Sequence, residues 1–244
     1  MNIEYHKWWS PHLNRDMEFK VYGHGGKPVI VFPSSGGSFY EYEDFGMVEV
    51  CRPFLESGSI QLFTPDSIDK ESWLNSAIPH SQRIARHNDF ERYFFHELTP
   101  YIRQRTGQQM FMATGCSLGA YHSLNFLLKH TDVFDAAICL SGVYTLRFSV
   151  GDHMDSELYY HSPLHYLPGL NDEAVLERLR RSSLVICSGQ GAWEEETLRD
   201  TYQLQTILRH KNIPAWIDIW GHDVAHDWPW WKIQMPYFLK HLGY

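Results

Sequence analysis

The sequence has few cysteines, no excess of positive charge and no long apolar run. Its four cysteines, among 244 residues, stand at positions 51, 116, 139 and 187, too far apart for a zinc knuckle or a Cys-x-x-Cys redox motif. Cys139 and Cys187 lie in apolar runs, which indicates buried free thiols, so we expect a reducing, cytoplasmic compartment. No stretch approaches the roughly 18 apolar residues of a membrane span, and residues 1–9 show no secretory signal.

Basic residues are outnumbered: 21 Lys and Arg stand against 29 Asp and Glu, which gives a formal net charge of −8. Because nucleic-acid binding needs clustered cations, this balance argues against nucleic acid as the main partner. Repeats, low-complexity segments and Pro/Gly/Ser-rich linkers are also absent. With 43% hydrophobic residues, the chain has enough apolar surface for one core, so we interpret residues 1–244 as a single domain.

Short apolar runs alternate with helical stretches along most of the chain. The runs are typical of strands buried on both faces, and they cover residues 29–32, 60–63, 110–113, 136–140, 184–187 and 215–220. The expected helices cover residues 81–105, 118–130, 173–182, 195–211 and 229–242. Residues 17–22 alternate between apolar and polar as a half-buried strand does, and residues 3–9 could pair with them. This alternation predicts a mostly parallel sheet with helices on both faces and reactive groups at the carboxyl ends of its strands.

Residues 115–119 read Gly-Cys-Ser-Leu-Gly, a Gly-x-Ser-x-Gly pattern between an expected strand and an expected helix. A strand that turns sharply into a helix holds its middle residue in a strained conformation and exposes the hydroxyl. Ser117 is therefore the candidate nucleophile, and the N–H of Leu118, at the helix N-terminus, is a candidate oxyanion donor. Cys116, one step back along the turn, should point away into packing. The alternative is that these residues simply form a turn.

A serine hydroxyl needs a general base, and fifteen histidines are available. In this architecture the base follows the last strand, where the sequence offers His222 and His226. We favour His226, because its longer loop lets the ring reach Ser117, whereas His222 is expected to pack within the loop. Two histidines four residues apart also suit a metal, but no third ligand stands out, so we expect none.

The acid of such a triad should follow the run at 184–187, where a Gly-rich turn leads to Glu194, Glu195 and Glu196. A carboxylate there would fix the imidazole tautomer. Helical side chains point about 100° apart, so only one of the three can face the histidine. Glu194 is our choice and Glu195 the next. The alternative is that all three are charges placed at a helix N-terminus by its dipole.

These motifs resemble the α/β-hydrolase superfamily. More narrowly, they resemble its putative-esterase branch, which includes esterase D, feruloyl esterases and mycolyltransferase-like proteins. The resemblance covers residues 17–242 and includes the late segment His-Asp-Trp-Pro-Trp-Trp at 226–231. It implies a three-layer α/β-hydrolase fold with a mostly parallel, twisted sheet of about eight strands and helices on both faces.

The resemblance also implies the members of the site. It maps the triad to Ser117, His226 and a carboxylate among residues 194–196. The loop at 33–37 reads Pro-Ser-Ser-Gly-Gly where relatives commonly carry His-Gly-x-Gly-Gly, and the match makes Ser35 the second oxyanion donor beside Leu118. Residues 143–171 form an insertion rich in Tyr and His that either walls the pocket or packs as an ordinary loop, and the same alternatives apply to residues 39–45.

The leading function is a serine carboxylesterase that hydrolyses small carboxylic esters through an acyl-enzyme and needs no cofactor. An acyltransferase would use the same triad, and a non-catalytic binding protein could retain the same fold. We expect a small-molecule ester as the partner, and neither nucleic acid nor a membrane. The sequence leaves open the acyl and alcohol groups and whether the chain forms a homo-oligomer.

Overall fold

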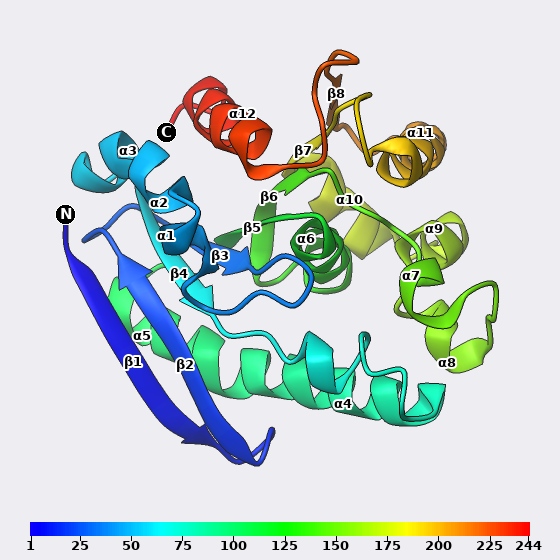
Figure 1. Ribbon diagram of the computed structural model, residues 1–244, viewed down its shortest axis with the longest axis horizontal. Coiled ribbons are helices and arrows are strands. Elements are labelled where there is room, and N and C mark those ends of the chain that lie inside the picture. The colour runs from blue at the N-terminus through cyan, green and yellow to red at the C-terminus, as the bar shows by residue number, and fades with distance from the viewer.

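Eight strands form one continuous sheet in the computed structural model, which describes all 244 residues (Figure 1). The strands are β1 (Ile3–Ser10), β2 (Arg15–Tyr22), β3 (Lys27–Phe32), β4 (Ile60–Pro65), β5 (Phe111–Cys116), β6 (Phe134–Leu140), β7 (Ser183–Ser188) and β8 (Trp216–Ile219). Their order across the sheet is β1-β2-β4-β3-β5-β6-β7-β8. β2 pairs antiparallel with β1 and β4, and all other pairs are parallel. The predicted mostly parallel sheet is therefore confirmed.

Helices cover both faces of this sheet. They are α1 (Glu41–Asp44), α2 (Met47–Val50), α3 (Arg52–Glu56), α4 (His80–Tyr93), α5 (Thr99–Thr106), α6 (Leu118–Lys129), α7 (Arg147–Val150), α8 (Ser156–Tyr159), α9 (Pro163–Tyr166), α10 (Glu173–Arg181), α11 (Glu195–His210) and α12 (Trp228–His241). Two 3₁₀ turns, η1 (Asp69–Glu71) and η3 (Leu167–Gly169), and a π turn, η2 (Phe94–Leu98), complete the set. None of these helices has the length and apolar character needed to cross a bilayer.

The two faces of the sheet carry separate hydrophobic cores. Along β3, Val29 and Val31 pack in the core beneath α1–α3 and α12, whereas Ile30 and Phe32 belong to the core beneath α4–α6, α10 and α11. Successive strand side chains point to opposite faces, so a strand covered on both sides must be apolar at every position. This explains the unbroken apolar runs of the sequence, and it fixes the carboxyl ends of the central strands at one edge.

The long helix expected at residues 81–105 is interrupted. It consists of α4, the π turn η2 and α5 in direct succession. Pro100 lies in the first turn of α5 and has no N–H to donate to the carbonyl of His96, so the regular ladder cannot continue through it. A π turn is a common way for a helix to absorb such a break.

Candidate active site

The sharp turn between β5 and α6 carries Ser117 at its apex. Its backbone lies at φ 56° and ψ −119°, a region that residues with a side chain rarely adopt. The flanking glycines permit the turn: a Cβ on Gly115 would lie 2.5 Å from the carbonyl carbon of Gly119, and one on Gly119 would lie 2.2 Å from the carbonyl oxygen of Phe32. The sequence therefore folds this way because any side chain at either position would collide with backbone.

Cys116, beside the apex, points away from the site. Its side chain is fully buried and its Sγ lies 3.9 Å from the hydroxyl of Tyr42. Burial raises the pKa of this thiol well above its usual range, so Cys116 stays protonated at neutral pH. Ser117 is partly exposed and lines a cavity of about 350 Å³.

The oxyanion loop, which we define as residues 33–37, lies beside this elbow. Ser35 and Leu118 both line the same cavity as Ser117. The first N–H groups of a helix have no partner within it, so the N–H of Leu118 is free to bind an anion. The N–H of Ser35 donates to no other group in the chain. The structure thus brings both expected donors to the candidate nucleophile.

Two loops at the carboxyl ends of β7 and β8 are joined by backbone hydrogen bonds. The N–H of Gly191 donates to the carbonyl of Val224 at 2.8 Å, and the N–H of His226 donates to the carbonyl of Ala192 at 2.9 Å. A Cβ on Gly189 would lie 2.1 Å from the carbonyl oxygen of Val224, so the glycine allows this close approach. The pairing holds His226 over the cavity, which its ring lines together with Ser117.

Glu194 lies directly behind His226. Its Oε2 is 3.5 Å from the Nδ1 atom of His226, and its side chain is only 1% exposed. This contact is the only side-chain hydrogen bond of the His226 ring. No hydrogen bond joins His226 to Ser117, and such contacts often tighten only when substrate binds.

Four polar groups hold the carboxylate of Glu194 in addition to the histidine. Ser141 Oγ donates to Oε1 at 2.5 Å, and the Gly189 N–H donates to the same oxygen at 3.3 Å. The hydroxyls of Ser188, at 3.3 Å, and of Thr197 donate to Oε2. Burial pushes the pKa of Glu194 upward, but the hydrogen bonds from His226, Ser141 and Thr197 outweigh it and lower the pKa below its ordinary value. The Glu194 carboxyl is therefore ionised at neutral pH.

Sequence reasoning missed Ser141, which binds the Glu194 carboxylate, and Trp231, which binds Ser141. Trp231, in the first turns of α12, donates its indole N–H to Ser141 Oγ at 2.9 Å. The edge of its ring also meets the His226 imidazole, with the two centroids 5.0 Å apart. Ser141 itself has a φ of 51°, a strained value at the end of β6. Ser141 and Trp231 are 90 positions apart, so no local sequence pattern could have linked them.

None of the other acid and base candidates forms a hydrogen bond with the His226 ring or with Ser117. His222 is exposed and does not line the cavity. Glu195 is exposed, and Glu196 lines the cavity but pairs with Arg199 at 3.2 Å. A further carboxylate close to these glutamates in sequence, that of Asp200, is buried and accepts the N–H of Tyr144 at 2.8 Å.

The insertion at residues 143–171 lines the cavity only at its start. Val143 and Phe148 lie on the cavity wall, together with Leu74 and Trp193. The tyrosines that made the insertion look like an aromatic wall lie elsewhere: Tyr144 is buried, and Tyr159, Tyr160 and Tyr166 line a separate cavity of about 510 Å³.

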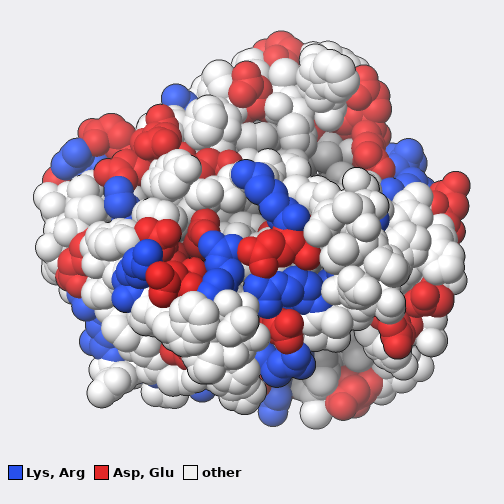
Figure 2. Space-filling view, turned by 60° about the horizontal axis from the view of Figure 1, so that its bottom comes forward, with Lys and Arg blue, Asp and Glu red and all other residues white.

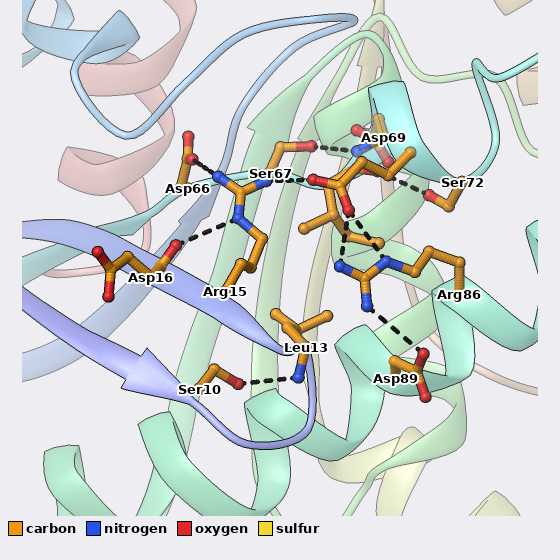
Figure 3. Close-up of polar contacts among 12 residues, drawn as sticks. Ser10, Leu13, Arg15, Asp16, Asp66, Ser67, Asp69, Ser72, Arg86 and Asp89 are labelled. Atoms are coloured by element: carbon orange, nitrogen blue, oxygen red, sulfur yellow. Dashed lines mark hydrogen bonds and ion pairs between the residues drawn. The ribbon is translucent and has the colours of Figure 1, made fainter.

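A network of ion pairs borders the oxyanion loop on its other side. Residues 66–71 and the loop's Gly36 and Gly37 line a shared cavity of about 220 Å³. Arg15, from β2, reaches Asp66 at 3.4 Å (Figure 3). Arg86, from α4, binds Glu71 at 2.6 Å. Acidic and basic side chains alternate in the same way over the face that carries α4 (Figure 2). These pairs neutralise one another, so this face presents no extended cationic surface.

One cluster outside the cavity has metal-ligand chemistry. His87, Glu91 and His161 place their ligand atoms within 4.8 Å of one another. The ammonium of Lys129, however, already binds Glu91 Oε1 and supplies the positive charge that this carboxylate needs. None of the three residues lines the Ser117 cavity.

A sheet of this order has a serine at the turn from a central strand into a helix and a histidine after the last strand. This arrangement is that of the α/β-hydrolase fold. The family model described as "Putative esterase" matches residues 10–242. The chain belongs to this family of carboxylic ester hydrolases, which confirms the predicted resemblance.

Solved structures show the same fold. A ferulic acid esterase has a TM-score of 0.78 at 16% identity, over 99% of this chain and 97% of its own. The S-formylglutathione hydrolase from Agrobacterium tumefaciens has a TM-score of 0.76 at 17% identity, over 98% and 93%. The fluorophosphonate-binding serine hydrolase F of Staphylococcus aureus has a TM-score of 0.74 at 16% identity, over 99% and 98%. A search of curated protein sequences found no match.

Proposed function

We propose that this protein is a serine carboxylesterase that hydrolyses small carboxylic esters through an acyl-enzyme, with Ser117, His226 and Glu194 as its triad. The observation that supports this most directly is the chain of contacts at the cavity. Ser117 stands at a strained elbow beside two free N–H groups, and His226 lines the same cavity with a buried carboxylate on its Nδ1 side.

Each group has a role in a balanced reaction. His226 Nε2 takes the proton of Ser117 as its Oγ attacks the ester carbonyl, and Glu194 stabilises the imidazolium that results. The N–H groups of Ser35 and Leu118 bind the oxygen that becomes negative. As the tetrahedral intermediate collapses, the C–O bond to the alcohol breaks and the imidazolium protonates the leaving alcohol. A water molecule then repeats the attack on the acyl-enzyme, releasing the acid and restoring Ser117.

The dimensions of the cavity favour small substrates. Its volume is about 350 Å³, and Leu74, Val143, Phe148 and Trp193 contribute apolar surface. Apolar walls with a few convergent polar groups are the usual character of small-molecule sites. We therefore propose a short or single-ring acyl group. Two structurally similar enzymes are named for such groups: a ferulic acid esterase and an S-formylglutathione hydrolase.

Stopped-flow hydrolysis of p-nitrophenyl esters of increasing acyl length tests this function. We expect a burst of p-nitrophenol of one equivalent per active site, then slower turnover, with efficiency falling for long chains. Product analysis with added methanol separates hydrolysis from acyl transfer: the free acid should dominate if water is the acceptor. The absence of a burst and of turnover across the series would contradict the proposal.

We also propose the cytoplasm as the compartment. All four cysteines are free and buried, none of them in a disulfide, and a reducing environment suits such thiols.

A further inference from the structure

A second buried carboxylate, which the mechanism above does not use, lies under the oxyanion loop. It belongs to Glu41, the first residue of α1, which is only 7% exposed. The Oε2 atom accepts the backbone N–H of Ser34 at 2.8 Å, and Oε1 accepts the Ser34 hydroxyl at 2.6 Å. Both partners precede Ser35, whose N–H is a proposed oxyanion donor.

The loop forms a tight turn that orients this donor. The N–H of Gly37 donates to the carbonyl of Ser34 at 2.9 Å, and Gly36 has a φ of 71°. Ser35 and Gly36 are thus the two central residues of a turn with positive φ at its third position. In such a turn the N–H of the second residue has no internal partner and points outward. The Ser35 N–H belongs to the peptide that follows Ser34, so its direction depends on how residue Ser34 is held.

The Glu41 carboxylate lies close to both ends of the turn. It binds Ser34 at the start, and at the end a Cβ on Gly37 would lie 2.2 Å from Oε1. The carboxylate therefore fills the space beneath the turn, and a side chain at residue 37 would have to displace it. Asp66 fixes the chain just beyond, where it accepts the N–H of Phe39 at 3.3 Å.

This placement of Glu41 is costly. Burial raises the pKa of its carboxyl, and the two hydrogen bonds from Ser34 offset only part of that effect. No Lys, Arg or His side chain forms an ion pair with Glu41, in contrast to Glu43 in the same helix, which binds Lys20. A buried carboxylate without a counter-charge persists only where its contacts are strong, and all of its side-chain hydrogen bonds come from the oxyanion loop.

We propose that Glu41 is a positioning residue that holds the N–H and hydroxyl of Ser34, so that the N–H of the next residue, Ser35, points at the developing oxyanion. This inference rests on the proposed esterase function. Glu41 acts through geometry and not through its charge, because a negative charge near the oxyanion would oppose the reaction. A glutamine can keep both contacts, since its amide oxygen accepts the Ser34 N–H and its NH₂ group donates to the Ser34 hydroxyl.

The test compares Glu41→Ala with Glu41→Gln and with Glu43→Gln, a control on the same helix that does not touch the loop. Loss of an oxyanion donor costs on the order of 10²–10³ in kcat. A displaced donor should cost less, so we expect Glu41→Ala to lower kcat about 10- to 100-fold with KM within about threefold. Glu41→Gln should restore kcat to within about fivefold of wild type, and Glu43→Gln should match wild type.

A boronic acid that adds to Ser117 mimics the tetrahedral intermediate and provides a second readout. Its inhibition constant should rise in Glu41→Ala in parallel with the loss of kcat/KM. A purely structural role would lower the melting temperature but leave kcat and the inhibition constant of the folded enzyme unchanged. If Glu41→Ala does not fold, Ser34→Ala removes one of the two contacts with little structural risk, and it should lower kcat about threefold to tenfold.

The outcomes separate this inference from the proposed function. A wild-type protein with no burst and no Ser117 adduct would overturn the esterase function itself. An active wild type with unchanged kcat in folded Glu41→Ala, or in Ser34→Ala where Glu41→Ala does not fold, would overturn only the positioning role. Failure of Glu41→Gln to restore kcat would also overturn it, because it would show that charge, not geometry, is what the site requires.

Discussion

Replacing Glu194 with glutamine changes one atom of the proposed triad and preserves its volume. The structure fixes how the new amide would lie. Two donors, the Ser141 hydroxyl and the Gly189 N–H, point at Oε1, so the amide oxygen must occupy that position. The NH₂ group then takes the place of Oε2, which faces the Nδ1 atom of His226. The hydroxyls near Oε2 can rotate to accept from it.

This orientation forces the wrong tautomer on the histidine. With an NH₂ donor opposite it, Nδ1 must act as the acceptor, and the proton of the neutral ring moves to Nε2. A protonated Nε2 cannot accept the proton of Ser117. In a triad of this kind such a change costs about 10⁴ in kcat, or about 5.4 kcal/mol at 1.36 kcal/mol per tenfold. We therefore expect Glu194→Gln to lose about four orders of magnitude in kcat while remaining folded.

Single-turnover hydrolysis of a p-nitrophenyl ester measures this loss, and circular dichroism verifies the fold. Glu195→Gln and Glu196→Gln are matched controls, since they make the same change one and two residues along the chain, and both should retain activity within about threefold of wild type. A loss below tenfold in Glu194→Gln, or a severe loss in either control, would refute the reasoning and move the acid elsewhere.

Three further predictions follow from the same contacts. His226→Ala should lower kcat by several orders of magnitude, toward the roughly 10⁶-fold loss seen when a triad base is removed. His222→Ala should lower kcat by less than about threefold. The reverse order of the two losses in a steady-state assay would contradict the choice of base. Cys116→Ala should keep most of the activity and Ser117→Ala should abolish the burst, so a burst that survives in Ser117→Ala would show that another group is acylated. Burial, with the charges of His87 and Lys129, lowers the pKa of His161 from 6.5 to about 3 although Glu91 opposes them. Between these values the unfolded state binds the extra proton, so the free energy of unfolding should fall as pH decreases, by at most about 1.4 kcal/mol per pH unit from this group. Urea unfolding at pH 7 and pH 5 should show a smaller fall in His161→Asn, and an equal fall would contradict it.

Local sequence patterns could predict the sheet and the elbow because short-range physics determines them. The run at 110–113 and the glycines at 115 and 119 require only their own neighbours to make a buried strand and a sharp turn. The π turn before Pro100 was not predicted, because residues 81–105 keep a helical pattern on both sides of it. The short helices α1–α3 and α7–α9 span only four or five residues each, too few for a periodicity to appear.

Sequence analysis could predict only those residues of the candidate site that lie near a recognisable motif. The sequence narrows the acid to three adjacent glutamates, but what distinguishes Glu194 is contact with Ser141, 53 residues away, which in turn binds Trp231. The proposed role of Glu41 is equally invisible in the sequence. Residues 39–45 could be a pocket wall or an ordinary loop, and only the fold turns this carboxylate inward beneath Ser34. Long-range hydrogen bonds of this kind leave no periodic signal.

The central claim is that Ser117 forms the covalent acyl intermediate, and one measurement tests it most directly. The protein is treated with a fluorophosphonate, digested, and the adduct located by peptide mass spectrometry. We predict a single adduct on Ser117, formed at the rate at which esterase activity disappears, and none in Ser117→Ala. An adduct on Cys116 or any other residue, or full esterase activity in protein labelled at Ser117, would contradict the account.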